Sequence, residues 1–161
     1  MEDNENEKRI VEAPAEEYLP GTRENLDVNI CPYIEQNPDT KFVVFFPPYS
    51  ILFWNDVVVG NHLEATLAQY RYLAERLNAY DNVEVYFFPD REDIILDLNN
   101  YADYSHYHPR YNRFMAECFA DGSTGLVAKE GSKKGKTIDE YLSHMKTIVQ
   151  NYDFEELLSG E

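Results

Sequence analysis

Basic residues are scarce in this chain, which has 14 Lys and Arg against 30 Asp and Glu in 161 residues and a formal net charge of -16. A protein that neutralises nucleic-acid phosphates needs a basic patch on its surface. The only basic cluster here is the short run KEGSKKGK at 129–136. The charge balance therefore excludes DNA and RNA as partners.

Cysteines and long apolar runs are also few. Cys31 and Cys118 show no spacing typical of a zinc site or a disulfide framework, so we expect both to be small core residues. The longest apolar run, 42–46, is far too short to cross a bilayer, and no basic-then-apolar signal opens the chain. The sequence predicts no membrane span, and no cofactor is expected.

Apolar residues make up 43% of the chain and 23 residues are aromatic, which is enough for one domain with a sizeable core. Residues 1–20 differ, because they hold seven acids, two bases and two prolines with almost no apolar periodicity. We predict an acidic mobile arm over 1–20 and a single folded unit over 21–161.

The first half of this unit predicts a helix, a strand and a second helix. Over 25–36, four apolar residues recur at helical spacing, with Pro32 in a first turn or at a kink. These residues are Leu26, Ile30, Tyr33 and Ile34. The run KFVVFFPP at 41–48 predicts a strand buried on both faces. The second half of 51–80 has the period of an amphipathic helix.

A second strand is predicted over 83–88, and a strand, a helix and a strand indicate parallel pairing. Two further helices follow. Pro109 opens one and Gly122 ends it, while Thr137 and Glu140 form a capping box for the last. The fold class is thus α/β with a mostly parallel sheet. Two strands are too few for a complete doubly wound sheet, so the sheet is expected to be incomplete in this chain.

Polar residues gather where the two strands end, and ligands of open α/β sheets bind at that edge. Asp103 and His106 form a D-x-x-H pattern, and a turn brings side chains three residues apart to one side. A carboxylate that holds one imidazole nitrogen leaves the other free to act as a base. The alternative is an Asp that caps a turn beside a surface His.

Two other assignments compete with this acid–base pair. Ser50 follows a strand as a nucleophile does, but it lacks flanking glycines and also fits the cap of the next helix. His106 and His108 form an H-x-H pattern that could hold a metal, yet no further ligand pattern accompanies them, so no metal site is predicted. A wall of tyrosines for sugar rings would involve Tyr101, Tyr104, Tyr107 and Tyr111.

Three segments, FFPPYSILFW at 45–54, NVEVYFF at 82–88 and DLNNYADYSHYHPRYN at 97–112, resemble the C-terminal region of bacterial SGNH/GDSL-hydrolase-like proteins. The similarity is to cell-envelope members in the style of the lipoteichoic-acid D-alanylation and alginate-acetylation proteins, and it covers about 25–152. It implies part of a three-layer αβα, flavodoxin-like fold. It also implies a catalytic role for Asp103 and His106, whose spacing matches the last motif of the family.

The family places its nucleophilic serine in a G-D-S-like motif, and this sequence has neither that motif nor G-x-N-D. The resemblance therefore implies the C-terminal portion of an acyl-ester hydrolase or acyltransferase, inactive alone, that acts on an acylated carbohydrate or a small ester. Relatives are extracytoplasmic cell-envelope proteins. We further expect Tyr49, Ser50, Asn100 and Tyr104 to line the site.

A non-catalytic binding or assembly module on the same fold is the competing hypothesis. Because the predicted strands lack neighbours, we also expect the chain to pair with a copy of itself, with its own N-terminal segment or with an N-terminal half.

Overall fold

The structure, a computed structural model, describes residues 12–159, so most of the predicted acidic arm lies outside the described residues. The described part of that arm contacts the folded unit. The amide of Ala13 donates to the carbonyl of Asn61 at 2.9 Å, and the ring of Tyr18 stacks on His62 with centroids 5.7 Å apart. The first helix, α1 (Leu19–Asn25), begins before the predicted boundary at residue 20.

The first helical rod is not a regular α-helix. A π-helical turn, η1 (Leu26–Ile30), joins α1 to α2 (Cys31–Gln36), and the amide of Cys31 donates to the carbonyl of Leu26. Pro32 lies in the first turn of α2, as predicted, where its missing N–H costs least. The wider turn changes which residues face inward.

Two of the four apolar residues that recur at helical spacing in this rod do not face the core. Ile30 is 36% exposed and Tyr33 is 71% exposed, whereas Leu26, Cys31 and Ile34 are buried. The physical reason is the extra residue of the π turn, which moves Cys31 to the place that α-helical spacing assigns to Ile30.

The sheet of the described residues has two strands, β1 (Phe42–Phe46) and β2 (Val83–Phe87). They pair in parallel with Phe42 opposite Val83, which confirms the predicted parallel α/β arrangement. The other edge of β2 bonds to an extended segment, since Val127 donates to Val85 at 2.8 Å and Phe87 donates to Gly125 at 2.7 Å. Within residues 12–159, no strand pairs with the outer edge of β1.

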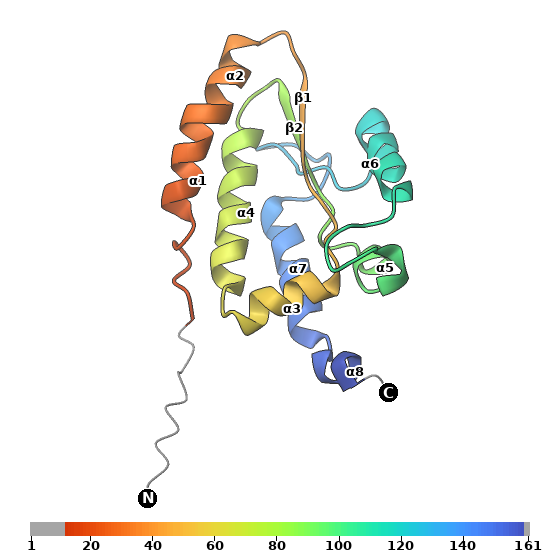
Figure 1. Ribbon diagram of the computed structural model, residues 1–161. Coiled ribbons are helices and arrows are strands. Elements are labelled where there is room, and N and C mark those ends of the chain that lie inside the picture. The colour runs from red at the N-terminus through yellow and green to blue at the C-terminus, as the bar shows by residue number, and fades with distance from the viewer. Residues whose placement is uncertain (1–11, 160–161) are drawn as a thin grey trace, which may run out of the picture.

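Helices lie on both faces of this sheet (Figure 1). One face packs against α3 (Ile51–Val59), α4 (Leu63–Asn78) and α7 (Ile138–Asn151) in the main core. The opposite face packs against α6 (Arg110–Asp121) in a smaller cluster that contains Tyr86 and Phe88 of the β2 region. Two helices, α3 and α4, occupy the 51–80 segment, whose second half was predicted to be an amphipathic helix.

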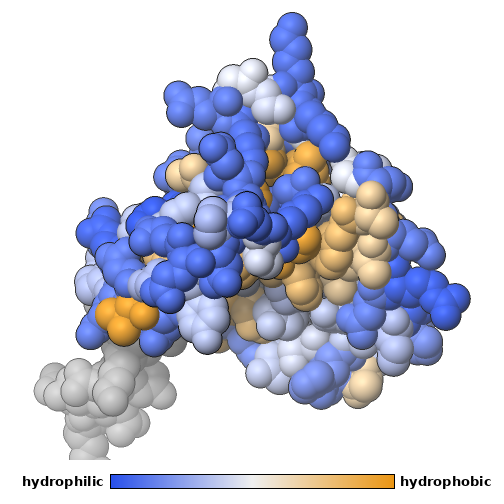
Figure 2. All heavy atoms as spheres, turned by 90° about the horizontal axis from the view of Figure 1, so that it is seen from above, coloured by the Kyte–Doolittle hydropathy of each residue, from blue (hydrophilic) through white to orange (hydrophobic). Residues whose placement is uncertain are grey.

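The prediction that the first strand is buried on both faces was wrong. On the face toward α6, Val43 is 38% exposed and Phe45 is 41% exposed. α6 covers β2 and reaches β1 through Phe119, whose ring centroid lies 5.4 Å from that of Phe45. Figure 2 shows that apolar atoms reach the surface among hydrophilic residues when the molecule is viewed from above.

The later helices follow their predicted signals. Pro109 caps α6, and Gly122 ends it in the left-handed conformation at φ 62°. Thr137 and Glu140 form the predicted capping box of α7. Short elements complete the order, namely α5 (Glu92–Ile95), η2 (Leu98–Asn100) and α8 (Phe154–Ser159). Both cysteines are buried and unbonded to each other, as expected. None of the helices between residues 12 and 159 combines the length and apolarity that a bilayer crossing requires.

Candidate functional site

The polar segment after β2 folds back on itself as a short hairpin-like loop over residues 100–108. The amide of His108 donates to the carbonyl of Asn100 at 2.7 Å, and the amide of Ala102 donates to the carbonyl of His106 at 2.8 Å. Tyr101 and Tyr107 face each other across this loop in an antiparallel bridge. Asp103 therefore lies at the tip of the loop, where the chain reverses.

The predicted contact between Asp103 and His106 is present. Asp103 Oδ2 lies 2.6 Å from His106 Nδ1, while Asp103 Oδ1 accepts hydrogen bonds from the amides of Ser105 at 2.9 Å and His106 at 2.8 Å. The carboxylate thus caps the turn and also holds the ring. The two backbone amides, followed by the ring of His106, hold the pKa of Asp103 well below its usual range.

Side-chain hydrogen bonds attach this loop to segments that precede it in the chain. The hydroxyl of Tyr101 donates to the carbonyl of Pro48 at 2.7 Å, and the side-chain amide of Asn100 donates to the carbonyl of Ile94 at 2.9 Å. The Ser50 hydroxyl donates to the carbonyl of Tyr104. The loop is therefore fixed to the residues that follow β1.

Ser50 is the cap of α3, because its Oγ accepts a hydrogen bond from the amide of Phe53 at 3.4 Å. The residue is fully buried, and its hydroxyl proton is engaged by Tyr104. Of the two roles that the sequence allows for Ser50, the structure therefore favours the cap over the nucleophile.

A cavity of about 340 Å³ opens beside His106, between the end of β1, the loop and the first turn of α6. The residues that line it are Pro47, Tyr49, Ser105, His106, Tyr107 and Asn112. His106 has a side chain that is 79% exposed, and within residues 12–159 no hydrogen bond engages its Nε2. The nitrogen opposite the carboxylate is thus available to a ligand.

The four residues expected to line the site divide into two groups. Tyr49 lines the cavity. Ser50 and Asn100 are buried and anchor the loop instead, and the ring of Tyr104 stacks over Phe53 with centroids 6.4 Å apart. Asn112 lines the cavity as well, and the sequence offered no signal for it beyond its place in the first turn of a helix.

The other histidine of the H-x-H pattern plays a local role. Nδ1 of His108 accepts a hydrogen bond from the amide of Arg110 at 3.1 Å, at the start of α6. In the part of the chain from residue 12 to residue 159, no group of three or more His, Cys, Asp or Glu side chains is arranged to hold a metal ion.

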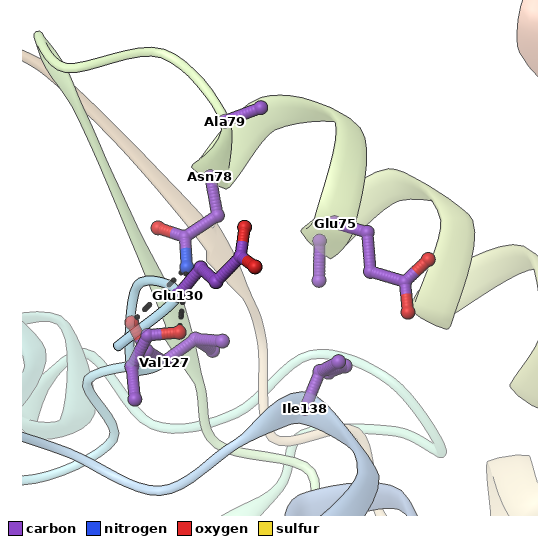
Figure 3. A pocket seen from close by; sticks show the side chains of 8 residues that line it. Glu75, Asn78, Ala79, Val127, Glu130 and Ile138 are labelled. Atoms are coloured by element: carbon purple, nitrogen blue, oxygen red, sulfur yellow. Dashed lines mark hydrogen bonds between the residues drawn. The ribbon is translucent and has the colours of Figure 1, made fainter. Parts of the chain in front are cut away.

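A second cavity of about 340 Å³ lies between the end of α4, the segment 127–130 that follows α6, and the start of α7 (Figure 3). Glu75 and Glu130 are among the residues that line it, and Asn78 donates to the carbonyl of Ala128 at 2.9 Å beside it. The described residues around this cavity include no imidazole, thiol or hydroxyl side chain. The titratable groups of its lining are therefore the carboxylates of Glu75 and Glu130.

Sequence reasoning missed a third arrangement of titratable groups. His144 lies between two carboxylates, with Nδ1 3.0 Å from Asp90 and Nε2 3.0 Å from Glu92. Asp90 is buried three residues after the end of β2, so His144 ties α7 to the segment that follows that strand. Both nitrogens are engaged, which leaves none for a ligand.

Comparisons of this chain with protein-family models, with curated proteins and with solved structures gave no match.

Proposed function

We propose that this chain supplies the acid–base pair of a serine-type acyl-ester hydrolase or acyltransferase of the SGNH/GDSL kind. The observation that carries the proposal is the 2.6 Å contact of Asp103 Oδ2 with His106 Nδ1, combined with a free Nε2 at a cavity. His106 acts as the general base, and Asp103 orients it.

The chemistry follows from the two nitrogens of the ring. Asp103 accepts the Nδ1 proton, which fixes the tautomer with an unprotonated Nε2 and stabilises the imidazolium that forms later. Nε2 then takes the proton of a hydroxyl nucleophile as it attacks the ester carbonyl, and returns it to the leaving alcohol. The ionised state of Asp103 at neutral pH supports this role.

The nucleophile comes from outside the described residues. Ser105 has its hydroxyl 3.5 Å from Nδ1, the nitrogen that Asp103 already occupies. Ser50 is engaged by Tyr104. The unpaired edge of β1 supports an external source, because a parallel strand added there would end at the cavity edge. Such strands would complete a three-layer, flavodoxin-like sheet.

A non-catalytic binding module is the second candidate. Within residues 12–159, no Ser, Thr or Cys side chain contacts Nε2 of His106, and this observation favours it. In that case the cavity recognises a ligand and His106 donates or accepts a hydrogen bond without proton transfer.

Reconstitution separates the two candidates. The isolated chain should turn over p-nitrophenyl acetate negligibly, and addition of a serine-bearing N-terminal half of an SGNH-type relative should restore esterase activity. That activity should vanish with His106→Ala and fall strongly with Asp103→Asn, because each removes part of the proton-transfer path. His108→Ala is the matched control and should leave activity near the unmodified level.

Two outcomes would overturn the proposal. A reconstituted enzyme that is indifferent to His106→Ala would remove the catalytic role and leave the binding module. Robust activity of the isolated chain that is lost with Ser50→Ala would show that the nucleophile is Ser50.

A further inference from the structure

A third cavity, of about 240 Å³, lies between the end of β2, the segment that follows α6 and the start of α7. Among the described residues, none lines both this cavity and the one at His106. Its floor is aromatic, because the buried rings of Phe87 and Tyr141 both line it, with centroids 5.3 Å apart. Ligands of open α/β sheets bind beyond the carboxyl ends of the strands, and the end of β2 is such a place.

A buried carboxylate lines this cavity. Asp90 is 6% exposed, and its Oδ2 lies 3.0 Å from His144 Nδ1, so one of its oxygens is already engaged. The other oxygen, Oδ1, accepts no hydrogen bond from residues 12–159, and it is not sealed from solvent. A carboxylate oxygen with so little hydration gains most from a donor that also carries positive charge. Asp90 therefore favours an ammonium group.

A cation lines the same cavity. Nζ of Lys136 lies 5.4 Å from the centre of the Tyr141 ring, and no carboxylate of residues 12–159 lies within ion-pair distance of it. Arg91 lines the cavity as well, but its Nε and Nη2 already donate to Asp93 at 2.8 and 2.6 Å. Lys136 is thus available to an anion, and Thr124 adds a hydroxyl donor to the lining.

The two charges together narrow the class of ligand. A simple anion would lie next to the buried carboxylate of Asp90, and a simple cation would meet the ammonium of Lys136. A molecule with an ammonium and a carboxylate on one carbon avoids both repulsions and pairs with both groups. The aromatic floor suits an apolar side chain. The volume lies below the range of about 300–1,000 Å³ that is usual for drug-sized ligands, so the molecule is small.

We propose that this cavity binds a free α-amino acid with an apolar side chain. Its ammonium group bonds Oδ1 of Asp90, and its carboxylate pairs with Lys136. Its side chain packs on the rings of Phe87 and Tyr141. His144 fixes the carboxylate of Asp90 through Oδ2 and is a positioning residue of this site. The site is independent of the proposed acyl-ester chemistry.

Three probes of similar shape test the charge requirement on the full chain. L-Leucine at millimolar concentration should shift the amide signals of Thr124, Gly125 and Lys136 in ¹H–¹⁵N spectra in a saturable manner. Isocaproate lacks the ammonium group and isoamylamine lacks the carboxylate. Each should bind about tenfold more weakly or worse, as expected for one lost charge-assisted hydrogen bond.

Two substitutions in the lining separate the contacts. Asp90→Asn should weaken leucine binding about tenfold or more. Its control is Glu92→Gln, which changes the partner of the other nitrogen of His144 outside the cavity lining and should leave affinity unchanged. Lys136→Met should weaken leucine binding to a similar degree but should not weaken isoamylamine binding, because the amine has no carboxylate. Lys133→Met, an exposed change on the same loop outside the lining, is its control.

Several results would overturn the inference. They are the absence of a saturable shift with leucine, equal affinity for leucine and isocaproate, leucine binding that survives either Asp90→Asn or Lys136→Met, and equal weakening by Glu92→Gln. If Asp90→Asn unfolds the chain, which the dispersion of the same spectra shows, Lys136→Met decides alone, because Lys136 is exposed. The esterase test bears on the other cavity, so neither result depends on the other.

Discussion

The hydroxyl of Ser50 donates a hydrogen bond to the backbone carbonyl of Tyr104, across 54 residues of chain. One buried side chain thereby joins the end of β1 to the loop that carries Asp103 and His106. The same oxygen accepts the amide of Phe53 as the cap of α3.

Ser50→Ala should lower the free energy of unfolding by about 2 kcal/mol, because it removes a helix cap and leaves the carbonyl of Tyr104 without its donor. Denaturant titration measures this change. Ser143→Ala, at an exposed position of α7, is the matched control and should stay within about 0.5 kcal/mol of the unmodified chain. Equal stability of the two variants would mean that Ser50 does not anchor the loop.

The carboxyl group of Asp103 should titrate below its ordinary value of about 3.9. A depressed pKa in the folded state contributes stability that is present above about pH 4 and is lost as the pH falls through the folded value. The ¹³C shift of the carboxyl carbon measures the midpoint directly.

His106→Ala tests the cause of this depression. The backbone amides of Ser105 and His106 are its largest causes and survive the substitution, so the midpoint should remain below 3.9 and rise only in part. A midpoint at the ordinary value in the unmodified chain would contradict the observed turn geometry.

Val43→Lys should reduce self-association of the chain. β1 presents an unpaired edge among the described residues and an open apolar face, and a lysine on such a strand opposes pairing. Sedimentation velocity over a range of concentrations measures the effect. Val59→Lys, at an exposed position at the end of α3, is the control. An unmodified chain that is monomeric at every concentration would rule out pairing of copies through β1.

Gly135→Ala should destabilise the fold strongly, by about 3 kcal/mol or more. Gly135 has φ 90°, and a Cβ there would lie 2.3 Å from the carbonyl oxygen of Leu126, a backbone atom that cannot move aside. Gly131→Ala is the control, because φ is also positive, at 74°, but the space around it is open. It should cost only about 1–2 kcal/mol in thermal or denaturant unfolding.

Local signals in the sequence were enough to predict the elements whose ends are set by neighbouring residues. Thr137 and Glu140 fix the start of α7, and Gly122 fixes the end of α6, so both helices could be predicted. Asp103 and His106 are three residues apart, and their contact could be predicted for the same reason.

Contacts between distant segments could not be predicted in this way. His144 meets Asp90 across 54 residues, the same separation as between Ser50 and Tyr104, and no periodicity links them. The open face of β1 was missed because an apolar run indicates burial without saying how far a covering helix extends. The exposure of that face of β1 depends on where α6 lies over the sheet.

The π turn between α1 and α2 makes the length of this rod adjustable. Deletion of one residue from a regular helix turns every later side chain by about 100° and usually ruins its packing. Here the deletion of Asn29 would convert the wide turn into an ordinary one and would keep both Leu26 and Ile34 facing the core. Pro32 would then lie inside a continuous α-helix, so the shortened rod also needs Pro32→Ala. The extra residue and the proline therefore form a matched pair, and each is tolerated because the other is present.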